Sequence, residues 1–219
     1  MAERTNKPAI LIMAKAPIPG FCKTRMQPAF TPEQCASLQD ALFKDLMALK
    51  KELEPRVHVW VSFTPKDSEV YFQAFSSRIF GQKGKDLGER MHHGLAYLLA
   101  QSYQPVLVIG TDTPLRKQDI YKAFELLKED SVVLGPAEDG GYHLLGVTRD
   151  FPVLFSDMPW GTNLVLEETE RRAARLGLTV RMLDKKRDID NPDDLRVYEK
   201  LTTNHHLDKW KEENLNRLK

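Results

Sequence analysis

The feature of this 219-residue sequence that most constrains its fold is the alternation of short apolar runs with longer helical patterns. Ala9–Ala14 and Pro105–Gly110 are almost continuous apolar runs, which are typical of strands buried on both faces of a sheet. Between them, the stretch that begins at Thr31 carries leucines at helical spacing until Pro55 interrupts it. This alternation predicts a mostly parallel sheet that is covered by helices on both faces.

The rest of the chain continues the same pattern. Further strands are expected at five stretches, 57–63, 78–80, 131–136, 142–147 and 178–183. Helices are expected over 31–54, 67–75, 86–101, 117–128, 161–177 and 192–201, the first capped by Thr31 and the last by Asn191 or Asp190. We therefore expect one domain over 1–203, followed by a charged helical tail over 204–219 that is exposed or frayed.

Composition excludes several classes of function. Lys and Arg together number 32 and Asp and Glu 31, so the net charge of +1 offers no global attraction for nucleic acid or an anionic membrane. No apolar run is long enough to span a membrane. The only cysteines, Cys22 and Cys35, do not form a disulfide scaffold, which favours a cytoplasmic protein. An anionic ligand must therefore be bound by a local cluster, in a monomer or a dimer.

An aspartate follows the strongest strand of the sequence. Asp112 lies in Thr111-Asp112-Thr113-Pro114, directly after the run that ends at Gly110. In open α/β sheets ligands bind outside the carboxyl ends of the strands. A carboxylate at that edge suits a hard divalent cation, which prefers oxygen ligands. The alternative is that Asp112 caps the next helix.

The loop after the first strand is basic. Lys15, Lys23 and Arg25 supply three positive charges, Gly20 supplies flexibility and Thr24 supplies a hydroxyl. Cations and backbone amides at the end of a buried strand can converge on a phosphate. The spacing matches neither the P-loop nor the dinucleotide-binding glycine motif. The alternative is a solvated basic loop.

Two further acidic segments are candidates for the same edge. Asp188 and Asp190 are two apart in a short extended segment, so both can face one cation, although capping is again an alternative. The turn Glu138–Gly141 directs Asp139 and Tyr142 toward the strand ends, unless it is an ordinary hairpin turn. His143 is interpreted as structural.

Two helix N-termini supply the remaining candidates. Arg90 follows Asp86-Leu87-Gly88-Glu89 and can hold an anion, although a surface salt bridge is an equal alternative. The segment Pro159-Trp160-Gly161-Thr162 places a glycine and a hydroxyl near the start of another helix.

Six motifs occur in order along the chain: M-A-K-A-P-x-P-G-x-x-K-T-R, Q-x-G-x-D-L-G-E-R-M, G-T-D-T-P, G-P-A-E-D-G-G-Y-H-L-L-G, P-W-G-T and D-I-D-N-P-D-D-L. Together they resemble a bacterial family of predicted nucleotide-diphospho-sugar transferases with the GT-A fold. The resemblance runs from about Ala9 to Leu201. The same layout is similar to the 2-phospholactate and phosphoenolpyruvate guanylyltransferases of deazaflavin cofactor synthesis and, more distantly, to molybdenum cofactor guanylyltransferases.

The resemblance implies a GT-A fold: a Rossmann-like, three-layer α/β/α sandwich whose mostly parallel central sheet contains a late antiparallel strand. The first strands would bind the nucleotide and the C-terminal half the acceptor. Asp112 matches the metal-binding aspartate of the superfamily, and in the guanylyltransferase relatives the aspartates that match Asp188 and Asp190 join it around magnesium. Lys15, Lys23 and Arg25 match the basic loop that meets the phosphates. Gly161 and Thr162 match a stretch near the anionic group of the acceptor.

The candidate site residues form four groups. The catalytic candidates are Asp112, Asp139 as a general base, and Lys23. The metal candidates, for Mg²⁺ or Mn²⁺, are Asp112, Asp188 and Asp190. The nucleotide and phosphate candidates are Ala14, Lys15, Gly20, Lys23, Thr24, Arg25, Arg90 and Thr111. The acceptor candidates are Gly141, Tyr142, Trp160, Gly161 and Thr162.

Three functions remain open at this stage. The first is a metal-dependent glycosyltransferase that uses a nucleotide or nucleotide-sugar donor and a small-molecule acceptor. The second is a nucleotidyltransferase that joins a nucleoside triphosphate to a phosphorylated small acid and releases pyrophosphate. The third is a nucleotide-binding module without catalysis. The proline-rich first loop, in place of the glycine-rich loop of many nucleotidyltransferases, counts against the second function. The single aspartate of Asp112-Thr113-Pro114, in place of the D-x-D of sugar transferases, counts against the first.

Overall fold

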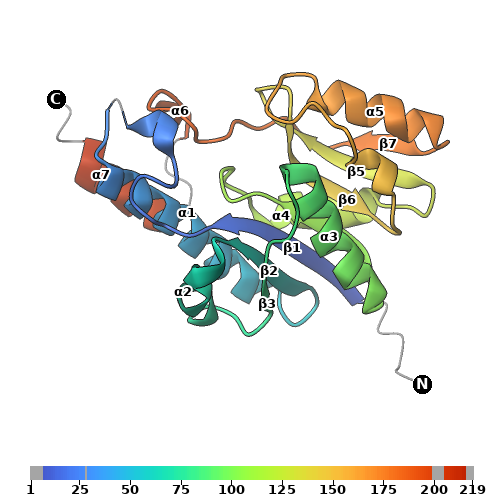
Figure 1. Ribbon diagram of the computed structural model, residues 1–219, viewed down its shortest axis with the longest axis horizontal. Helices are drawn as coiled ribbons and strands as arrows, with labels where there is room; N and C mark the ends of the chain where they lie inside the picture. Colours follow the sequence, from blue (N-terminus) through green and yellow to red (C-terminus); the bar gives the residue numbers. More distant parts are fainter. Residues whose placement is uncertain (1–6, 28, 199–204, 216–219) are drawn as a thin grey trace.

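The computed structural model describes residues 7–27, 29–198 and 205–215 (Figure 1). Its sheet has seven strands in the order β3-β2-β1-β4-β6-β5-β7. Within the described residues only β6 runs antiparallel to its neighbours. The strands are β1 (Lys7–Lys15), β2 (His58–Thr64), β3 (Ile79–Gly81), β4 (Tyr103–Ile109), β5 (Ser131–Pro136), β6 (Tyr142–Val147) and β7 (Thr179–Met182). The mostly parallel sheet with a late antiparallel strand is confirmed.

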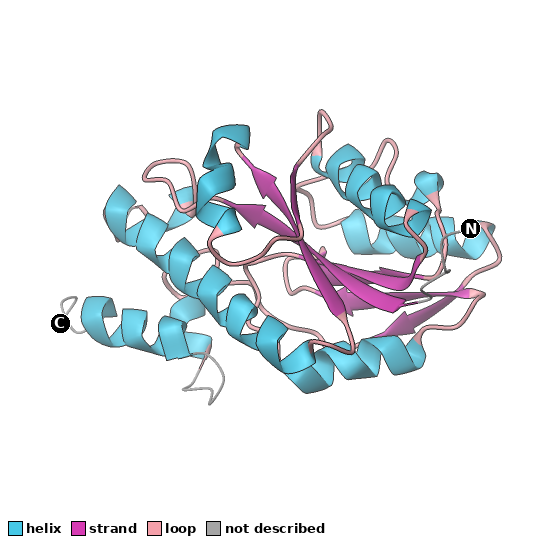
Figure 2. Ribbon diagram, turned by 90° about the horizontal axis from the view of Figure 1, so that it is seen from below, coloured by secondary structure: helices cyan, strands magenta, loops and turns pink. Residues whose placement is uncertain are grey.

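Helices cover both faces of this sheet, as Figure 2 shows. One layer consists of α1 (Pro32–Leu53), α2 (Glu69–Gln73) and α4 (Lys117–Leu126), and the other of α3 (Leu87–Ala100) and α5 (Val165–Arg175). Short 3₁₀ turns lie at η1 (Thr24–Met26), η2 (Lys66–Ser68) and η3 (Pro152–Leu154), and two more helices follow, α6 (Asp194–Val197) and α7 (His205–Leu215). The three-layer α/β/α sandwich is therefore confirmed.

The continuous apolar run of β1 follows from this double cover. Ile10 and Ile12 pack into the core on the α1 side, while Ala9 and Leu11 pack into the core on the α3 side. All four side chains are at most 1% exposed. A strand that is buried on both faces has no position for a polar side chain until it reaches the edge of the sheet.

Helix α1 begins as the sequence predicts. The Thr31 hydroxyl accepts a hydrogen bond from the Gln34 amide at 3.2 Å, and the Gln34 side chain accepts one from the Thr31 amide at 2.8 Å. Pro32 occupies the first turn, where its missing N–H costs nothing. This reciprocal capping fixes the start of the longest helix, which supports the loop that precedes it.

The C-terminal segment differs from expectation. Helix α7 is present, but Leu207 and Trp210 are only 1% and 4% exposed because they pack against α1. Figure 2 shows the two helices side by side. The Asp45 carboxylate on α1 accepts hydrogen bonds from the His206 and Leu207 amides, both at 3.0 Å. The expected exposure is therefore wrong for this face. The division at 203–204 lies outside the described residues and stays a prediction.

Two smaller expectations also change. Helix α6 covers only Asp194–Val197 of the predicted 192–201, of which 199–201 lie outside the described residues. Asp193 occupies the N-cap position without a side-chain capping bond, whereas the Asn191 side chain accepts hydrogen bonds from the Asp193 and Asp194 amides at 3.0 and 3.3 Å, as its expected capping role requires. Leu87, which the helical spacing places on a buried face, is 47% exposed.

Among the described residues, no helix combines the length and the apolarity that a membrane crossing requires.

The topology brings distant loops to one edge. Six strands end with their carboxyl ends at this edge, and antiparallel β6 begins there at Tyr142. The segment after β7 returns across it, since Lys186 pairs with Ala137 and the Ile189 amide donates to the Asp112 carbonyl at 2.9 Å. The loops that carry Lys23, Asp112, Asp139 and Asp188 therefore meet.

Candidate functional site

A cavity of about 600 Å³ opens at the carboxyl edge of the sheet. Every site residue that the sequence predicts, except Gly20, lines it. Those residues are Ala14, Lys15, Lys23, Thr24, Arg25, Arg90, Thr111, Asp112, Asp139, Gly141, Tyr142, Trp160, Gly161, Thr162, Asp188 and Asp190. Gly20 has a φ of +78° in the loop after β1, and a Cβ there would meet open space. Its expected place in the phosphate site is therefore not seen.

Asp112 lies just past the end of β4 and does not cap a helix. Helix α4 begins five residues later, with Arg116 at its N-cap position. The Asp112 backbone carbonyl is bound by Ile189, whereas its side chain is 46% exposed toward the cavity. The capping alternative for Asp112 is therefore wrong, and its carboxylate faces the cavity, where it pairs with Lys23.

Lys23 connects the two halves of the chain at this point. Its ammonium lies 2.6 Å from Asp112 Oδ1 and 3.5 Å from Asp190 Oδ1, and it donates to the Ile189 carbonyl at 2.5 Å. The side chain is only 3% exposed. Lys23 adopts a left-handed backbone conformation, with φ of 49° and ψ of 37°, which is uncommon for a residue with a side chain. The burial of this side chain and its three oxygen contacts place the ammonium at the aspartates.

Asp188 and Asp190 both face the cavity, beside Asp112. The Asp188 carboxylate accepts a hydrogen bond from the Thr113 hydroxyl. Burial raises the pKa of Asp188 to about 6; the Thr113 hydrogen bond opposes this, and the nearby Asp112 and Asp190 add to it. Burial also raises the pKa of Asp190, against the lowering effect of Lys23. The rim formed by Asp112, Asp188 and Asp190, called the acidic rim below, thus holds more negative charge than Lys23 neutralises.

The chemistry of the acidic rim suits a divalent cation, although the side chains do not form a closed cage. Among the described residues, no group of three or more acidic, histidine or cysteine side chains is arranged so that it could hold a metal ion by itself. All candidate ligand atoms are oxygens, however, which is the donor set of Mg²⁺ and Mn²⁺. Mg²⁺ usually takes one or two carboxylates and completes its shell with waters and substrate phosphates. The donor atoms of the rim are therefore of the type that Mg²⁺ takes when substrate phosphates complete its shell.

Three further cations line the cavity. Arg25 lies 3.3 Å from Asp190, but its side chain is 75% exposed. Lys15 lies over the Phe21 ring at 5.8 Å from its centroid, and Arg90 Nε donates to the Gly84 carbonyl at 3.1 Å. Neither Lys15 nor Arg90 has a carboxylate within ion-pair distance among the described residues. The salt-bridge alternative for Arg90 is thus not seen there, and both cations are available to an anionic ligand.

A wall without charge lines the same cavity and is formed by Tyr142, His143 and Trp160, called the neutral wall below. The Tyr142 and Trp160 rings pack edge to face at 6.4 Å. Burial raises the pKa of Tyr142 and lowers that of His143, which is 5% exposed, to about 4. Trp160 packs against Gly88 of α3, where a Cβ would lie 2.5 Å from the indole nitrogen. These groups are uncharged near pH 7, so the wall carries no ions, and both His143 ring nitrogens and the Trp160 indole nitrogen are buried without a hydrogen-bond partner among the described residues.

The turn between β5 and β6 is a hairpin and also belongs to the cavity. The Ala137 amide donates to the Gly141 carbonyl at 3.0 Å, and the Gly141 amide donates to Asp139 Oδ1 at 2.9 Å. Gly140 has a φ of +87°, and a Cβ there would lie 2.3 Å from the Asn163 carbonyl oxygen. The hairpin interpretation is correct for the backbone, and the exposed Asp139 lines the cavity as well.

Several lining residues were missed from the sequence. Gln82 follows β3 and donates to the Ser62 carbonyl at 2.9 Å, and Thr113 binds Asp188. Gln39 is 2% exposed in α1 and donates to the Thr111 hydroxyl at 2.9 Å. Gln82 and Thr113 lie in motifs that were recognised, so a signal existed. Gln39 gives none, since its partner is 72 residues away.

Residues 47–162 match the family DUF2064, described as an uncharacterized protein conserved in bacteria. The match covers more than half of the sequence. The chain belongs to this family. A search of curated proteins gave no significant match.

Several solved structures share the fold of this chain. The chain is 26% identical to a putative nucleotide-diphospho-sugar transferase from Desulfovibrio desulfuricans G20, with a TM-score of 0.85 over 96% of this chain and 97% of that one. It is 15% identical to CMP:2-keto-3-deoxy-manno-octonic acid synthetase, with a TM-score of 0.56, over 87% and 96% of the two chains. It is also 15% identical to the inositol-1-phosphate CTP transferase from T. maritima, with a TM-score of 0.53, over 94% of this chain and 96% of that one.

The last two similarities show the fold alone. The first extends over nearly the whole of both chains, so it confirms the resemblance to predicted nucleotide-diphospho-sugar transferases with a GT-A-like fold. The comparisons thereby support a transferase, without naming its donor or acceptor.

Proposed function

We propose that this DUF2064 protein is a metal-dependent transferase that acts on a nucleotide-activated donor, a nucleotide-diphospho-sugar in the first instance. One observation carries the proposal: the acidic rim and four cations line a single cavity at the carboxyl edge of the sheet. The similarity to the Desulfovibrio protein supports the same class of donor. A diphosphate needs both features, a cation held by carboxylates and fixed positive charges around its remaining oxygens.

The donor diphosphate would lie between the acidic rim and the basic loop. Lys15 and Arg90, which lack carboxylate partners among the described residues, would bind phosphate oxygens, with Lys23, Thr24 and Arg25 beside them. Asp112, Asp188 and Asp190 would hold Mg²⁺ or Mn²⁺, and the Thr113 hydroxyl would keep Asp188 oriented. The metal would neutralise the charge that grows on the leaving phosphate.

The acceptor would lie along the neutral wall. Tyr142 and Trp160 offer ring faces to an apolar or sugar-like face of a small molecule, and Gly161 leaves open space beside them. Asp139 is exposed at the adjoining turn and is the best placed general base for an acceptor hydroxyl. This arrangement supports transfer to a small molecule.

A panel of nucleoside diphosphate sugars tests this function. Each donor is added with Mn²⁺, and thermal shift identifies those that bind, because a ligand of the folded state raises apparent stability. The donor that binds is then incubated with candidate acceptors, and release of nucleoside diphosphate is measured. We expect binding that depends on metal and on Asp112. Absence of binding by every sugar nucleotide, with metal present, contradicts the proposal.

A second candidate is nucleotidyl transfer with release of pyrophosphate. It is favoured by the clustering of three aspartates from two distant segments, in place of a D-x-D motif directly after β4. Incubation with GTP, phosphoenolpyruvate and Mg²⁺ tests it, with pyrophosphate as the readout. Pyrophosphate release supports this candidate, whereas turnover of a sugar nucleotide without pyrophosphate supports the first. Tight metal-dependent binding without turnover of any donor would favour a binding module.

A further inference from the structure

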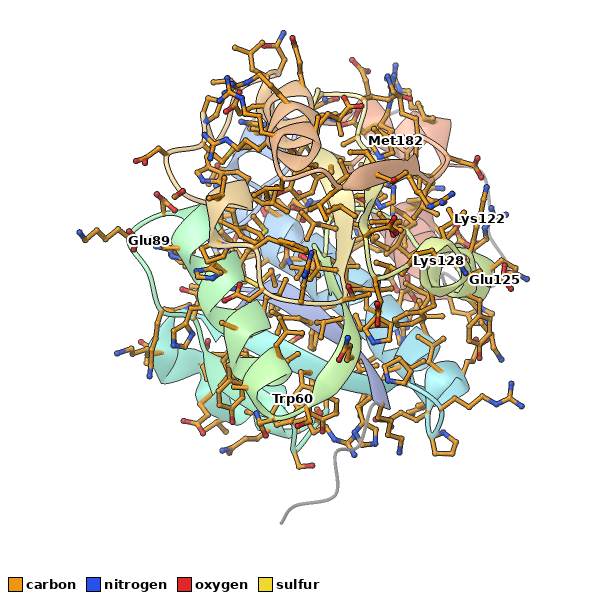
Figure 3. The ribbon with its side chains drawn as sticks, turned by 90° about the vertical axis from the view of Figure 1, so that its right-hand side faces the viewer. Trp60, Glu89, Lys122, Glu125, Lys128 and Met182 are labelled. Atoms are coloured by element: carbon orange, nitrogen blue, oxygen red, sulfur yellow. The ribbon has the colours of Figure 1, made fainter. Side chains whose placement is uncertain are left out.

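The surroundings of the Lys23 ammonium resemble those of a bound metal ion. The nitrogen has oxygens from Asp112, Ile189 and Asp190 at 2.6, 2.5 and 3.5 Å. Two carboxylates and a carbonyl are the ligand types of a hard divalent cation. A second Lys–Asp pair of the protein is different: Lys122 meets one carboxylate, that of Asp184, and both side chains are exposed. Figure 3 shows Lys122 projecting from the outer side of α4, across the view from Glu89 at the start of α3.

The burial of the three side chains is unequal. The Lys23 side chain is 3% exposed, whereas those of Asp112 and Asp190 are 46% and 35% exposed. The ammonium therefore reaches the carboxylates from inside the protein, and the same carboxylates remain open to a ligand in the cavity. A divalent cation that bound to Asp112 and Asp190 would lie close to the ammonium, and the two positive charges would repel each other.

We propose that Lys23 is a built-in cation that competes with the divalent metal for Asp112 and Asp190 until a nucleotide phosphate offers the ammonium another partner. The inference rests on the proposed function, since it concerns the metal and the phosphates of that site. The lysine side chain can move by rotation of its own torsions, from the carboxylates of the rim to a phosphate in the adjoining cavity. Lys23 is thus a positioning residue for the metal.

The consequence is that metal and nucleotide bind together. Without nucleotide, a metal ion must either displace the Lys23 ammonium or bind beside it against charge repulsion, so the affinity of the site for metal is low. With nucleotide, phosphate oxygens accept the ammonium and also ligate the metal. Coupling of this kind is reciprocal, so metal must raise nucleotide affinity by the same factor. The protein would then avoid holding a metal ion in the absence of its substrate.

Calorimetric titration with Mn²⁺ tests the role of Lys23 directly. Three proteins are compared without nucleotide: the wild type, Lys23→Met, which keeps an apolar side chain of similar length, and Lys122→Met as the matched control. We expect Lys23→Met to bind Mn²⁺ about tenfold more tightly than the wild type. Lys122→Met should bind Mn²⁺ as the wild type does, because its ion pair lies outside the cavity. In Lys23→Met with Asp112→Asn, the gain should disappear.

A second measurement uses the wild type alone and does not depend on how the variants fold. Mn²⁺ is titrated in the presence and absence of GDP, and then of UDP. We expect about tenfold tighter Mn²⁺ binding with the nucleotide that binds. Equal Mn²⁺ affinity of wild type and Lys23→Met, or binding by neither, would overturn the inference, as would a wild-type Mn²⁺ affinity that a bound nucleotide leaves unchanged. If no nucleotide binds, the proposed function fails, while the comparison with Mn²⁺ alone still decides the role of Lys23.

Discussion

The acidic rim and the neutral wall line the same cavity, but the rim consists of charged side chains and the wall of uncharged ones. At the rim, Asp112 and Asp190 share the Lys23 ammonium, and burial still raises the pKa of Asp188 to about 6. At the wall, burial keeps His143 uncharged and the aromatic rings meet each other. The comparison indicates that charge is concentrated where phosphate chemistry would occur, and excluded where a neutral part of a substrate would pack.

The largest expected effect is at the rim. Asp112→Asn keeps the size of the side chain but removes its charge, so the metal loses a ligand. Since Lewis-acid stabilisation is worth several kcal/mol, we expect turnover of the identified donor to fall on the order of a thousandfold. Asp184→Asn, which removes a carboxylate with an 80% exposed side chain, is the control and should keep full activity. Unchanged turnover in Asp112→Asn would remove the rim from the mechanism.

The next effect is the pH dependence of stability that His143 of the neutral wall contributes. The pKa of His143 is lowered from its usual value to about 4, so its contribution to stability is present above pH 6.5 and is lost as pH falls through 4. Protonation therefore destabilises the fold by on the order of 3 kcal/mol over this range. In His143→Leu that part of the pH dependence should vanish. Urea unfolding at pH 7 and pH 4.5 measures it, and parallel losses of stability in both proteins would contradict the neutral wall.

A smaller effect tests how the wall is supported. Gly88→Ala places a methyl group 2.4 Å from the Phe155 carbonyl oxygen and 2.5 Å from the Trp160 indole nitrogen. We expect a loss of about 2 kcal/mol in stability and a raised KM for the acceptor, with donor affinity unchanged. Gly94→Ala on the same helix meets the flexible end of Leu11, so it should lower stability without raising that KM. Equal kinetic effects would show that Trp160 does not contact the acceptor.

The smallest effect is expected outside the cavity. Lys122→Met removes an ion pair whose two side chains are 48% and 80% exposed. Surface pairs of this kind contribute less than about 1 kcal/mol. Thermal unfolding at low and high salt should therefore show almost no change. A larger loss would mean that exposed pairs matter as much as the pair at the rim, and the contrast between the two would not hold.

Local patterns predicted most of the fold. The continuous apolar runs correctly predicted β1 and β4, and the Thr31 capping pattern correctly predicted the start of α1. They failed where a partner lies far away in sequence, as for the buried face of α7, which depends on Asp45, or for Gln39 beneath Thr111. Hydrophobic spacing also misplaced Leu87, which is 47% exposed because it lines the cavity. Local sequence reports which faces are apolar but not what covers them.

The site follows the same division. The sequence by itself determined that acidic and basic loops follow buried strands, because the carboxyl ends of parallel strands meet at one edge and charged side chains can lie in the loops there. Only the tertiary structure decided that Lys23 reaches Ile189 and Asp190 across 166 residues and more, and that Gly20 remains outside the cavity. The physical reason is that strand order and the returning segment after β7 set these distances. Neither of them produces a periodic pattern in the sequence from which it could be predicted.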